Sequence, residues 1–348
     1  MSAKTYRRKL DIANGHIDLS HGAGGRAMAQ LIADLFHAAL DNEWLRQGND
    51  QAAFDVAAGR MVMTTDSYVI SPLFFPGGDI GSLAVHGTIN DIAVGGARPL
   101  YLSAGFIIEE GFALSDLKRI VDSMAAAARA TGVAVITGDT KVVERGKGDG
   151  LFISTTGIGV APPGLELSAE KARPGDRVIV SGSIGDHGVA VMSRRQNLSF
   201  DTEIVSDSAP LHDLVTAILD AGGASLRVMR DPTRGGLAAT LNELAQRSGV
   251  GLRLDEAKLP VKPGVAAACE LLGLDPLHVA NEGKLVAVVA PDSADAVLAA
   301  MRDHPLGRDA AMIGEVVADA RRFVLMTTEF GGGRMVDWLS GEQLPRIC

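Results

Sequence analysis

The chain has 348 residues, and its mix of 47% hydrophobic and 22% charged residues indicates a globular protein, with two domains as the expectation from length. Its formal net charge of -9 argues against nucleic acid as a main partner, because phosphate backbones bind basic faces. With two cysteines and no apolar run of the ~20 residues that a membrane span needs, we expect neither a disulfide framework nor a membrane partner, and a cytoplasmic location.

The first half of the chain interleaves helical and strand patterns. Apolar residues recur at helical spacing from Met28 to Phe36, and Gly95-Gly96 and Pro99 end a second helical pattern. The expected strands are 60–65, 100–108, 133–137 and 151–160, and the expected helices include 82–94 and 115–130, the latter capped by Ser115.

A second set of strands and helices follows a linker rich in proline and glycine. The expected elements are strands 177–180 and 284–289 and helices 209–221, 236–248 and 294–301. We therefore predict an α/β (α+β) protein of two domains, 1–162 and 173–337, each a sheet covered by helices, and a flexible tail, 338–348. Three consecutive glycines, 331–333, supply a hinge for this tail.

Three carboxylates indicate a magnesium site. Asp66 and Asp139 each follow a predicted strand, and Asp91 lies beside Asn90 inside a predicted apolar helix. Carboxylates that converge offer the oxygen ligands of Mg²⁺, and the ion would let an acidic protein hold a triphosphate. Either strand-end aspartate alone is also a common turn residue. The polar pair in the helix is the stronger signal, because it costs stability unless it has a partner.

Two glycine-containing segments could bind phosphate at a helix start. The first is Gly22-Ala23-Gly24-Gly25-Arg26, and the second runs from Asp231 through Arg234 to Gly236. The first is not a Walker P-loop, because no Gly-Lys-Ser/Thr follows it. Read alone, the first segment is equally a connector and the second a capped helix start. The nucleotide contacts predicted from them are Gly24, Gly25, Arg26, Asp231 and Arg234.

One glutamate and one histidine are candidates for a general base. Glu282, in Asn281-Glu282-Gly283-Lys284, could remove a proton if it is partly desolvated. A lone turn glutamate more often faces solvent. His86 lies in the predicted apolar helix, where a histidine is more often a satisfied core residue than a catalyst.

The two cysteines differ in context. Cys269 lies among alanines and leucines and is interpreted as a buried small hydrophobe. Cys348 is the last residue of the sequence, beyond the glycine hinge, on a segment without apolar periodicity. An exposed thiol is a liability unless it is used, although an ordinary frayed terminus has the same appearance. The segment 337–348 could extend ~35 Å, far enough to bring the thiol into a pocket.

Taken together, these motifs resemble one superfamily. Their order is similar to that of the aminoimidazole ribonucleotide synthetase-like (PurM-like) proteins, which bind ATP; the segments are 21–26, 64–67, 87–93, 138–143, 231–236 and 281–283. The end, Leu344-Pro345-Arg346-Ile347-Cys348, is similar to that of one family within it, the carbamoyl dehydratases of hydrogenase maturation.

This resemblance implies a fold and an activity. The fold is a PurM-like pair of domains, an N-terminal ferredoxin-like ATP-binding domain and a C-terminal α/β domain, in a homodimer that binds ATP across its interface. A carbamoyltransferase, HypF, would load a carbamoyl group onto Cys348. The chain would dehydrate the group with ATP to a thiocyanate, and the HypC–HypD complex would receive the cyanide for the iron of a [NiFe]-hydrogenase.

The resemblance also assigns roles to the candidate residues. Mg²⁺ on Asp66, Asp91 and Asp139 would align the γ-phosphate, and Lys141 would neutralise charge on the transferred group. Glu282 is the first candidate for the base and His86 the second. Asn90 and Thr140 join the nucleotide contacts, and Cys348 carries the substrate.

Two other functions fit parts of the sequence. Another ATP-using enzyme of the superfamily is one: a selenophosphate synthetase would need a reactive residue near the first glycine segment, which has no cysteine, and the thiamine-phosphate kinase and purine enzymes would not use Cys348. A non-catalytic thiol carrier gated by ATP is the other. Phosphate release by the carbamoylated protein distinguishes a carrier from an enzyme.

Overall fold

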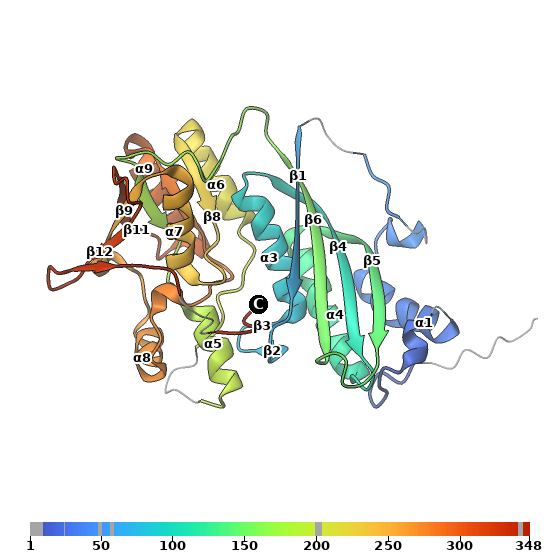
Figure 1. Ribbon diagram of the computed structural model, residues 1–348. Coiled ribbons are helices and arrows are strands. Elements are labelled where there is room, and N and C mark those ends of the chain that lie inside the picture. Colours follow the sequence, from blue (N-terminus) through green and yellow to red (C-terminus); the bar gives the residue numbers. More distant parts are fainter. Residues whose placement is uncertain (1–9, 24, 48–50, 56–58, 199–203, 340–343) are drawn as a thin grey trace, which may run out of the picture.

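The computed structural model describes residues 10–23, 25–47, 51–55, 59–198, 204–339 and 344–348. Two lobes lie side by side, and the chain ends between them at Cys348 (Figure 1). The predicted two-domain α/β class is confirmed. No helix of the described segments is long and apolar enough to cross a membrane.

The N-terminal domain is built on a four-stranded sheet in the order β1-β6-β4-β5. Its strands are β1 (Arg60–Tyr68), β4 (Arg98–Glu109), β5 (Ala134–Val143) and β6 (Leu151–Ala161). The helices α3 (Ile80–Val94) and α4 (Leu114–Thr131) cover one face of this sheet (Figure 1). Because α4 connects β4 to β5, these two strands pair in parallel, whereas β6 pairs antiparallel with β1 and β4.

The other face of this sheet carries apolar side chains in the open. Met61 and Met63 alternate with inward-facing residues of β1, and Met63 is 71% exposed. Ile107 of β4 is also exposed on this face. Met63 pairs with Ile158 and Ile107 with Phe152, so these side chains are separate exposed apolar positions on one sheet face.

Short elements complete the N-terminal domain. A helical segment packs beside β5; it comprises η1 (Leu19–Gly22), α1 (Arg26–Leu31), η2 (Ile32–His37), α2 (Ala38–Leu40) and η3 (Leu45–Gln47). The small strands β2 (Phe74–Phe75) and β3 (Gly78–Asp79) precede α3. The Asp79 side chain caps α3 by accepting hydrogen bonds from the backbone N–H groups of Gly81 and Ser82.

The C-terminal domain has a seven-stranded sheet in the order β13-β12-β9-β11-β7-β10-β8. The strands are β7 (Arg177–Val180), β8 (Leu226–Arg230), β9 (Gly251–Asp255), β10 (Val286–Val289), β11 (Ala311–Val317), β12 (Val324–Thr327) and β13 (Gly333–Met335). The helices are α5 (Asp186–Arg195), α6 (His212–Gly222), α7 (Gly236–Ser248), α8 (Pro263–Leu272) and α9 (Pro291–Asp303), with short turns η4 (Gly223–Ser225), η5 (Glu256–Lys258), η6 (Pro276–His278) and η7 (Pro305–Gly307). Separate cores fill its two faces, one beneath α7 and one beneath α6 and α9.

Helix α3 joins the domains. Ala93 and Val94 at its C-terminal end pack into the core beneath α6, together with Leu211. In the other direction, Val191 and Met192 of α5 pack into the core of the N-terminal domain. Side chains at this junction therefore come from both domains.

The elements predicted from periodicity are largely confirmed, with differences at their ends. The helix expected at 115–130 begins at Leu114, and Ser115 lies inside it without capping it. The strand expected at 284–289 begins at Val286. The pattern did not predict α5, whose glycine and histidine are poor helix signals, or the short strands β9, β11, β12 and β13.

Candidate active site between the two domains

Four carboxylates from separate segments gather at the junction of the domains. Asp66 lies on β1, Asp91 on α3, Asp231 just after β8 and Glu282 before β10. The Asp91 Oδ2 accepts a hydrogen bond from the Thr64 hydroxyl at 2.7 Å. We call these four residues the inner carboxylate cluster.

Three members of the inner carboxylate cluster, Asp91, Asp231 and Glu282, have a raised pKa. Burial and then the charge of Asp66 raise the pKa of Asp91, although the Thr64 hydrogen bond opposes the shift. Burial and then the charge of Asp91 raise the pKa of Asp231 to about 7. Burial raises the pKa of Glu282 well above its usual range, and Asp231 adds to the effect. The charge of Arg230 opposes the shifts at Asp91 and Asp231 but does not cancel them, so a further cation would favour the ionised carboxylates.

Glu282 is the most deeply buried member, at 3% exposure. Its Oε1 has no hydrogen-bond partner among the described residues. An unpaired buried carboxyl oxygen costs stability, so a native fold keeps one where a ligand uses it.

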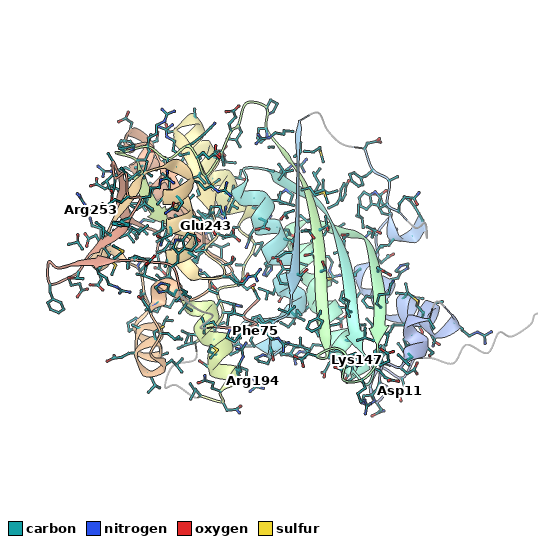
Figure 2. The ribbon with its side chains drawn as sticks, viewed as in Figure 1. Asp11, Phe75, Lys147, Arg194, Glu243 and Arg253 are labelled. Carbon is teal, nitrogen blue, oxygen red and sulfur yellow. The ribbon has the colours of Figure 1, made fainter. Side chains whose placement is uncertain are left out.

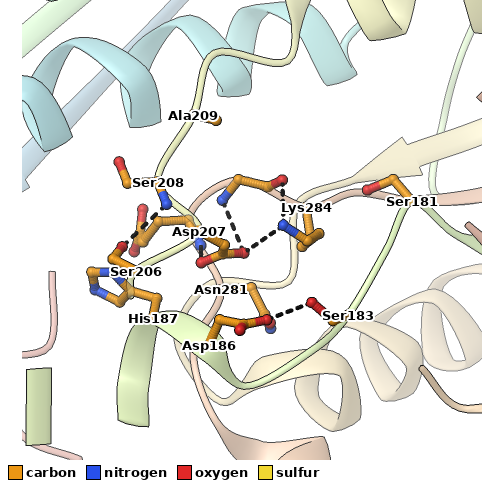
Figure 3. Close-up of polar contacts among 12 residues, drawn as sticks. Ser181, Ser183, Asp186, His187, Ser206, Asp207, Ser208, Ala209, Asn281 and Lys284 are labelled. Atoms are coloured by element: carbon orange, nitrogen blue, oxygen red, sulfur yellow. Dashed lines mark hydrogen bonds and ion pairs between the residues drawn. The ribbon is translucent and has the colours of Figure 1, made fainter. Parts of the chain in front are cut away.

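A second buried network supports the loop that carries Glu282. The Asp207 carboxylate accepts hydrogen bonds from the backbone N–H of Glu282 at 3.2 Å and pairs with Lys284 at 3.2 Å (Figure 3). Burial alone would raise the pKa of Asp207, but the charge of Lys284 holds it below its usual range. Asp207 therefore holds the Glu282 loop in place while Lys284 neutralises its charge.

Asn90, predicted as a nucleotide contact, links the two domains in this structure. Its amide donates to the backbone carbonyls of Ala209 and Glu282, and its Oδ1 accepts from the Leu211 N–H at 2.7 Å. The side chain is 1% exposed. These contacts explain the polar residue in an apolar helix, because Asn90 holds two loops of the C-terminal domain against α3.

Asp139 does not join Asp66 and Asp91 within one chain, contrary to the predicted trio. β5 and β1 are opposite edges of the sheet, and the row of paired residues from Asp66 reaches β5 at Gly138. Because side chains alternate along a strand, Asp139 faces the uncovered side and Asp66 the helix side. Asp139 instead pairs with Lys141 at 2.5 Å, and both side chains are 62% exposed.

The other N-terminal candidates lie near Asp139. Gly25 is the N-cap of α1, and Arg26, the first residue of that helix, is exposed. Thr140 is buried, and it lines a pocket of about 500 Å³ between the N-terminal helical segment and β5. Gly24 lies outside the described residues.

The remaining candidates are at the junction. The His86 Nδ1 lies 3.0 Å from the Ser208 hydroxyl, and burial and then the charge of His212 lower the pKa of His86 to about 4, which makes it a weak base. Arg234 is exposed in the turn before α7. Its link to the inner carboxylate cluster is in sequence, because Asp231 stands three residues earlier.

The end of the chain, expected as a flexible arm, is docked at this junction over residues 344–348. Val69, three residues after Asp66, donates its N–H to the Cys348 carbonyl at 3.0 Å. Ile347 is 2% exposed, and its carbonyl lies 2.8 Å from His187 Nε2. Cys348 packs against the N-terminal core.

Cys269 lies elsewhere, on α8, and is 1% exposed. Burial raises the pKa of its thiol to about 11. The prediction that it is a buried small hydrophobe is confirmed. Neither cysteine forms a disulfide.

Sequence reasoning missed three residues of the junction. Asp207 stands in a polar run, Ser206-Asp207-Ser208, that carries no motif signal. His187 and Arg195 lie on α5, which periodicity did not predict. A histidine between Asp186 and Gly188 was the one available signal, because a buried imidazole needs partners.

Comparisons with known proteins agree with this architecture. The AIR synthase related protein N-terminal and C-terminal domain models match residues 48–161 and 173–326. The carbamoyl dehydratase HypE of Bradyrhizobium diazoefficiens is 76% identical over 345 residues, which are 99% of this chain and 100% of that protein.

Two solved structures are also similar. One is hydrogenase maturation protein HypE in complex with ATP, with a TM-score of 0.91 and 49% identity over 95% of this chain and 99% of that one. The other is a HypE–HypF complex, with a TM-score of 0.78 and 51% identity over 89% of this chain and 99% of that one. The chain therefore belongs to the HypE family of carbamoyl dehydratases, within the AIR synthase related proteins.

Proposed function

We propose that this chain, an ATP-dependent carbamoyl dehydratase of hydrogenase maturation, carries its substrate on the sulfur of Cys348 and acts on it at the junction of the domains. The observation that carries the proposal is the docked end of the chain. The Cys348 carbonyl is bonded to Val69, only three residues from Asp66, about 10 Å along an extended strand. The end of the chain is therefore held on the segment that directly follows the strand of Asp66.

The chemistry balances with ATP as the second substrate. The carbamoyl oxygen attacks the γ-phosphorus and displaces ADP, which converts a poor leaving group into a phosphate ester. A base removes the protons of the nitrogen, and the C–O bond breaks to release phosphate. The carbamoyl oxygen ends in that phosphate, and the carbon and nitrogen remain on sulfur as a thiocyanate. Ile347, buried beside the site, helps to exclude water that would hydrolyse the ester.

Magnesium fits the inner carboxylate cluster. The raised pKa of Asp91 and Asp231 and the unpaired Glu282 oxygen support this proposal, because a bound cation would favour the ionised carboxylates. In the described part of the chain, no three His, Cys, Asp or Glu side chains are placed to hold a metal by themselves. That suits Mg²⁺, which commonly takes one or two carboxylates together with substrate phosphates. Asp66 and Asp91 are the proposed ligands, with Asp231 beside them, and the ion would neutralise phosphate charge.

Glu282 and Lys141 have complementary proposed roles. Burial makes the ionised Glu282 a stronger base than an ordinary glutamate, as removal of a proton from a carbamoyl nitrogen requires. Lys141 is an exposed cation on the uncovered face, where it can neutralise charge on the transferred group. His86, with its low pKa, is the weaker candidate for the base.

A homodimer would unite the two sets of residues. Within one chain, Asp139 and Lys141 face the uncovered side of the sheet, away from the inner carboxylate cluster. The same side carries Met61, Met63 and Ile107. Pairing two copies through this side would bury these three apolar side chains. It would also bring Asp139 and Lys141 of one copy toward the nucleotide of the other. Gly25, Arg26 and Thr140 lie near the same edge.

The proposed partners come from the family resemblance, and the HypE–HypF complex of a relative supports the first of them. A HypF carbamoyltransferase loads Cys348, and the HypC–HypD complex takes the cyanide from it. Both exchanges require Cys348 to leave the docked position. Cytoplasmic thiols stay reduced, so the cytoplasm is the compartment in which this carrier would work.

The direct test is a single-turnover reaction of carbamoylated protein with ATP and Mg²⁺. We expect one phosphate per carbamoyl group and a Cys348 peptide lighter by one water. A non-catalytic carrier would keep its carbamoyl mass and release no phosphate in step with it, and that outcome would refute the proposal.

A further inference from the structure

One arginine grips the docked end of the chain from the other domain. Arg195, the last residue of α5, donates from Nη1 to the Pro345 carbonyl at 2.8 Å and from Nη2 to the Arg346 carbonyl at 2.7 Å. Its Nε donates to the Ser71 carbonyl at 2.8 Å. One guanidinium thus connects the second domain, the first domain and the tail, using the several donors that only arginine presents in a fixed plane.

The other tail contacts differ in kind. The N–H groups of Val69 and Ser71 donate to the carbonyls of Cys348 and Arg346, so that the tail lies along this segment like an added strand. His187 donates from Nε2 to the Ile347 carbonyl, since a carbonyl only accepts, and its Nδ1 accepts from the Ser206 hydroxyl at 2.8 Å (Figure 3). His187 is wholly buried beside Phe75, and removing it would disturb packing.

Arg346 adopts a backbone conformation that resists docking. Its φ is 54°, in the left-handed region that residues other than glycine rarely occupy. Its guanidinium bonds to the Val69 carbonyl and pairs with Asp149, and both side chains are at least one-third exposed. An exposed ion pair contributes little. The Arg346 carbonyl accepts hydrogen bonds from both Arg195 and the Ser71 N–H, and Arg195 also holds the carbonyl of Pro345.

We propose that Arg195 is a positioning residue that latches the tail, setting the balance between a docked tail that presents Cys348 to the active site and an undocked tail open to partners. The inference rests on the proposed carrier role of Cys348. It assigns the control of that carrier to a side chain of the second domain that, among the described residues, hydrogen-bonds to the carbonyl oxygens of Ser71, Pro345 and Arg346 and to the Met192 sulfur.

The thiol itself reports the latch. We would measure the rate at which N-ethylmaleimide modifies Cys348 in the full-length protein, resolving the two cysteine peptides by mass. Buried Cys269, with its pKa raised to about 11, reacts slowly and serves as the internal reference. Loss of charged hydrogen bonds in Arg195→Ala should raise the Cys348 rate about tenfold. Arg195→Lys should fall between, and Asp149→Asn should raise the rate about twofold at most.

The matched control is Arg194→Ala. It removes the same charge from the same helix, and Arg194 is exposed at the lower rim of the molecule, away from the junction (Figure 2). Its labelling rate should equal that of the wild type. Equal rates in wild type and Arg195→Ala, or an equal rise in Arg194→Ala, would overturn the latch.

A kinetic readout separates the latch from the proposed function. In carbamoylated Arg195→Ala, thiocyanate formation should slow about tenfold with unchanged ATP affinity, and Arg195→Lys should recover part of the rate. If wild type forms no thiocyanate, the carrier proposal fails whatever the labelling shows. If wild type forms thiocyanate and Arg195→Ala forms it at the same rate, the latch alone fails.

Discussion

The inner carboxylate cluster and the Asp139–Lys141 pair place carboxylates in opposite electrostatic environments. In the cluster, burial and neighbouring charges raise the pKa of Asp91, Asp231 and Glu282. At the sheet edge, the hydrogen bond from Lys141 lowers the pKa of exposed Asp139. The cluster is short of positive charge, whereas the edge pair is already neutral.

This difference shows why neither region is a complete site. A triphosphate brings more negative charge, so the cluster can accept it only with a cation, and Lys141 is a cation that the same chain cannot deliver there. The homodimer proposal removes the difficulty, because a second chain would supply its own sheet edge. Replacing one residue at a time in each region tests whether the two regions have these different roles.

The largest effect is expected inside the cluster, at Glu282. Glu282→Gln keeps the shape but removes the base, so thiocyanate formation should fall at least about 100-fold, while ATP binding persists. The measurement is single-turnover thiocyanate formation beside nucleotide affinity. Turnover at the wild-type rate would transfer the base role elsewhere, with His86 next to be replaced.

A smaller effect is expected at the edge. Lys141→Ala should lower turnover about tenfold to 100-fold and change ATP affinity less, because the cation acts on the transferred group. Lys147→Ala, which removes another exposed lysine of the same domain, is the control and should keep full activity. If both variants behave alike, Lys141 is only an ion-pair partner of Asp139.

The smallest effect is on stability, and it depends on pH. Asp231 has a pKa of about 7 in the fold, above its unfolded value, so the folded state holds more protons between about pH 4 and pH 7. Its contribution is therefore present at low pH and lost as pH rises through 7. Without nucleotide, Asp231→Asn should melt higher than wild type by a margin that grows from pH 5 to about 5 °C at pH 8. A difference in melting temperature that does not change with pH would mean that the pKa of Asp231 is not raised in the folded protein.

Local patterns predicted most of the fold but only part of the site. The pattern located α4 because it has one buried face, and it located α3 because that helix is apolar along its length and ends at Gly95-Gly96. It placed Asp66 and Asp139 at strand ends and Asp91 inside a helix, but it did not predict the face of the sheet to which each side chain points. That depends on the register of four strands: one residue decides that Gly138, and not Asp139, continues the row of Asp66.

The junction was harder to foresee because its contacts join distant parts of the chain. Asn90 was noticed as a polar residue in an apolar helix, yet its partners lie about a hundred residues and more away. The tail groups that Arg195 and His187 contact are backbone carbonyls, which every residue has. The sequence therefore gives no sign of these contacts. The docked position of Cys348 therefore came from the structure alone.

The most direct test of the carrier role is the mass of the two cysteine peptides after loading. Wild-type protein, Cys348→Ala and Cys269→Ala would each be incubated with the carbamoyltransferase, carbamoyl phosphate and ATP, then digested. We predict a carbamoyl adduct on the Cys348 peptide that loses one water as phosphate is released, the same result in Cys269→Ala, and no adduct in Cys348→Ala despite normal folding. An adduct on Cys269, or normal loading of Cys348→Ala, would contradict the account.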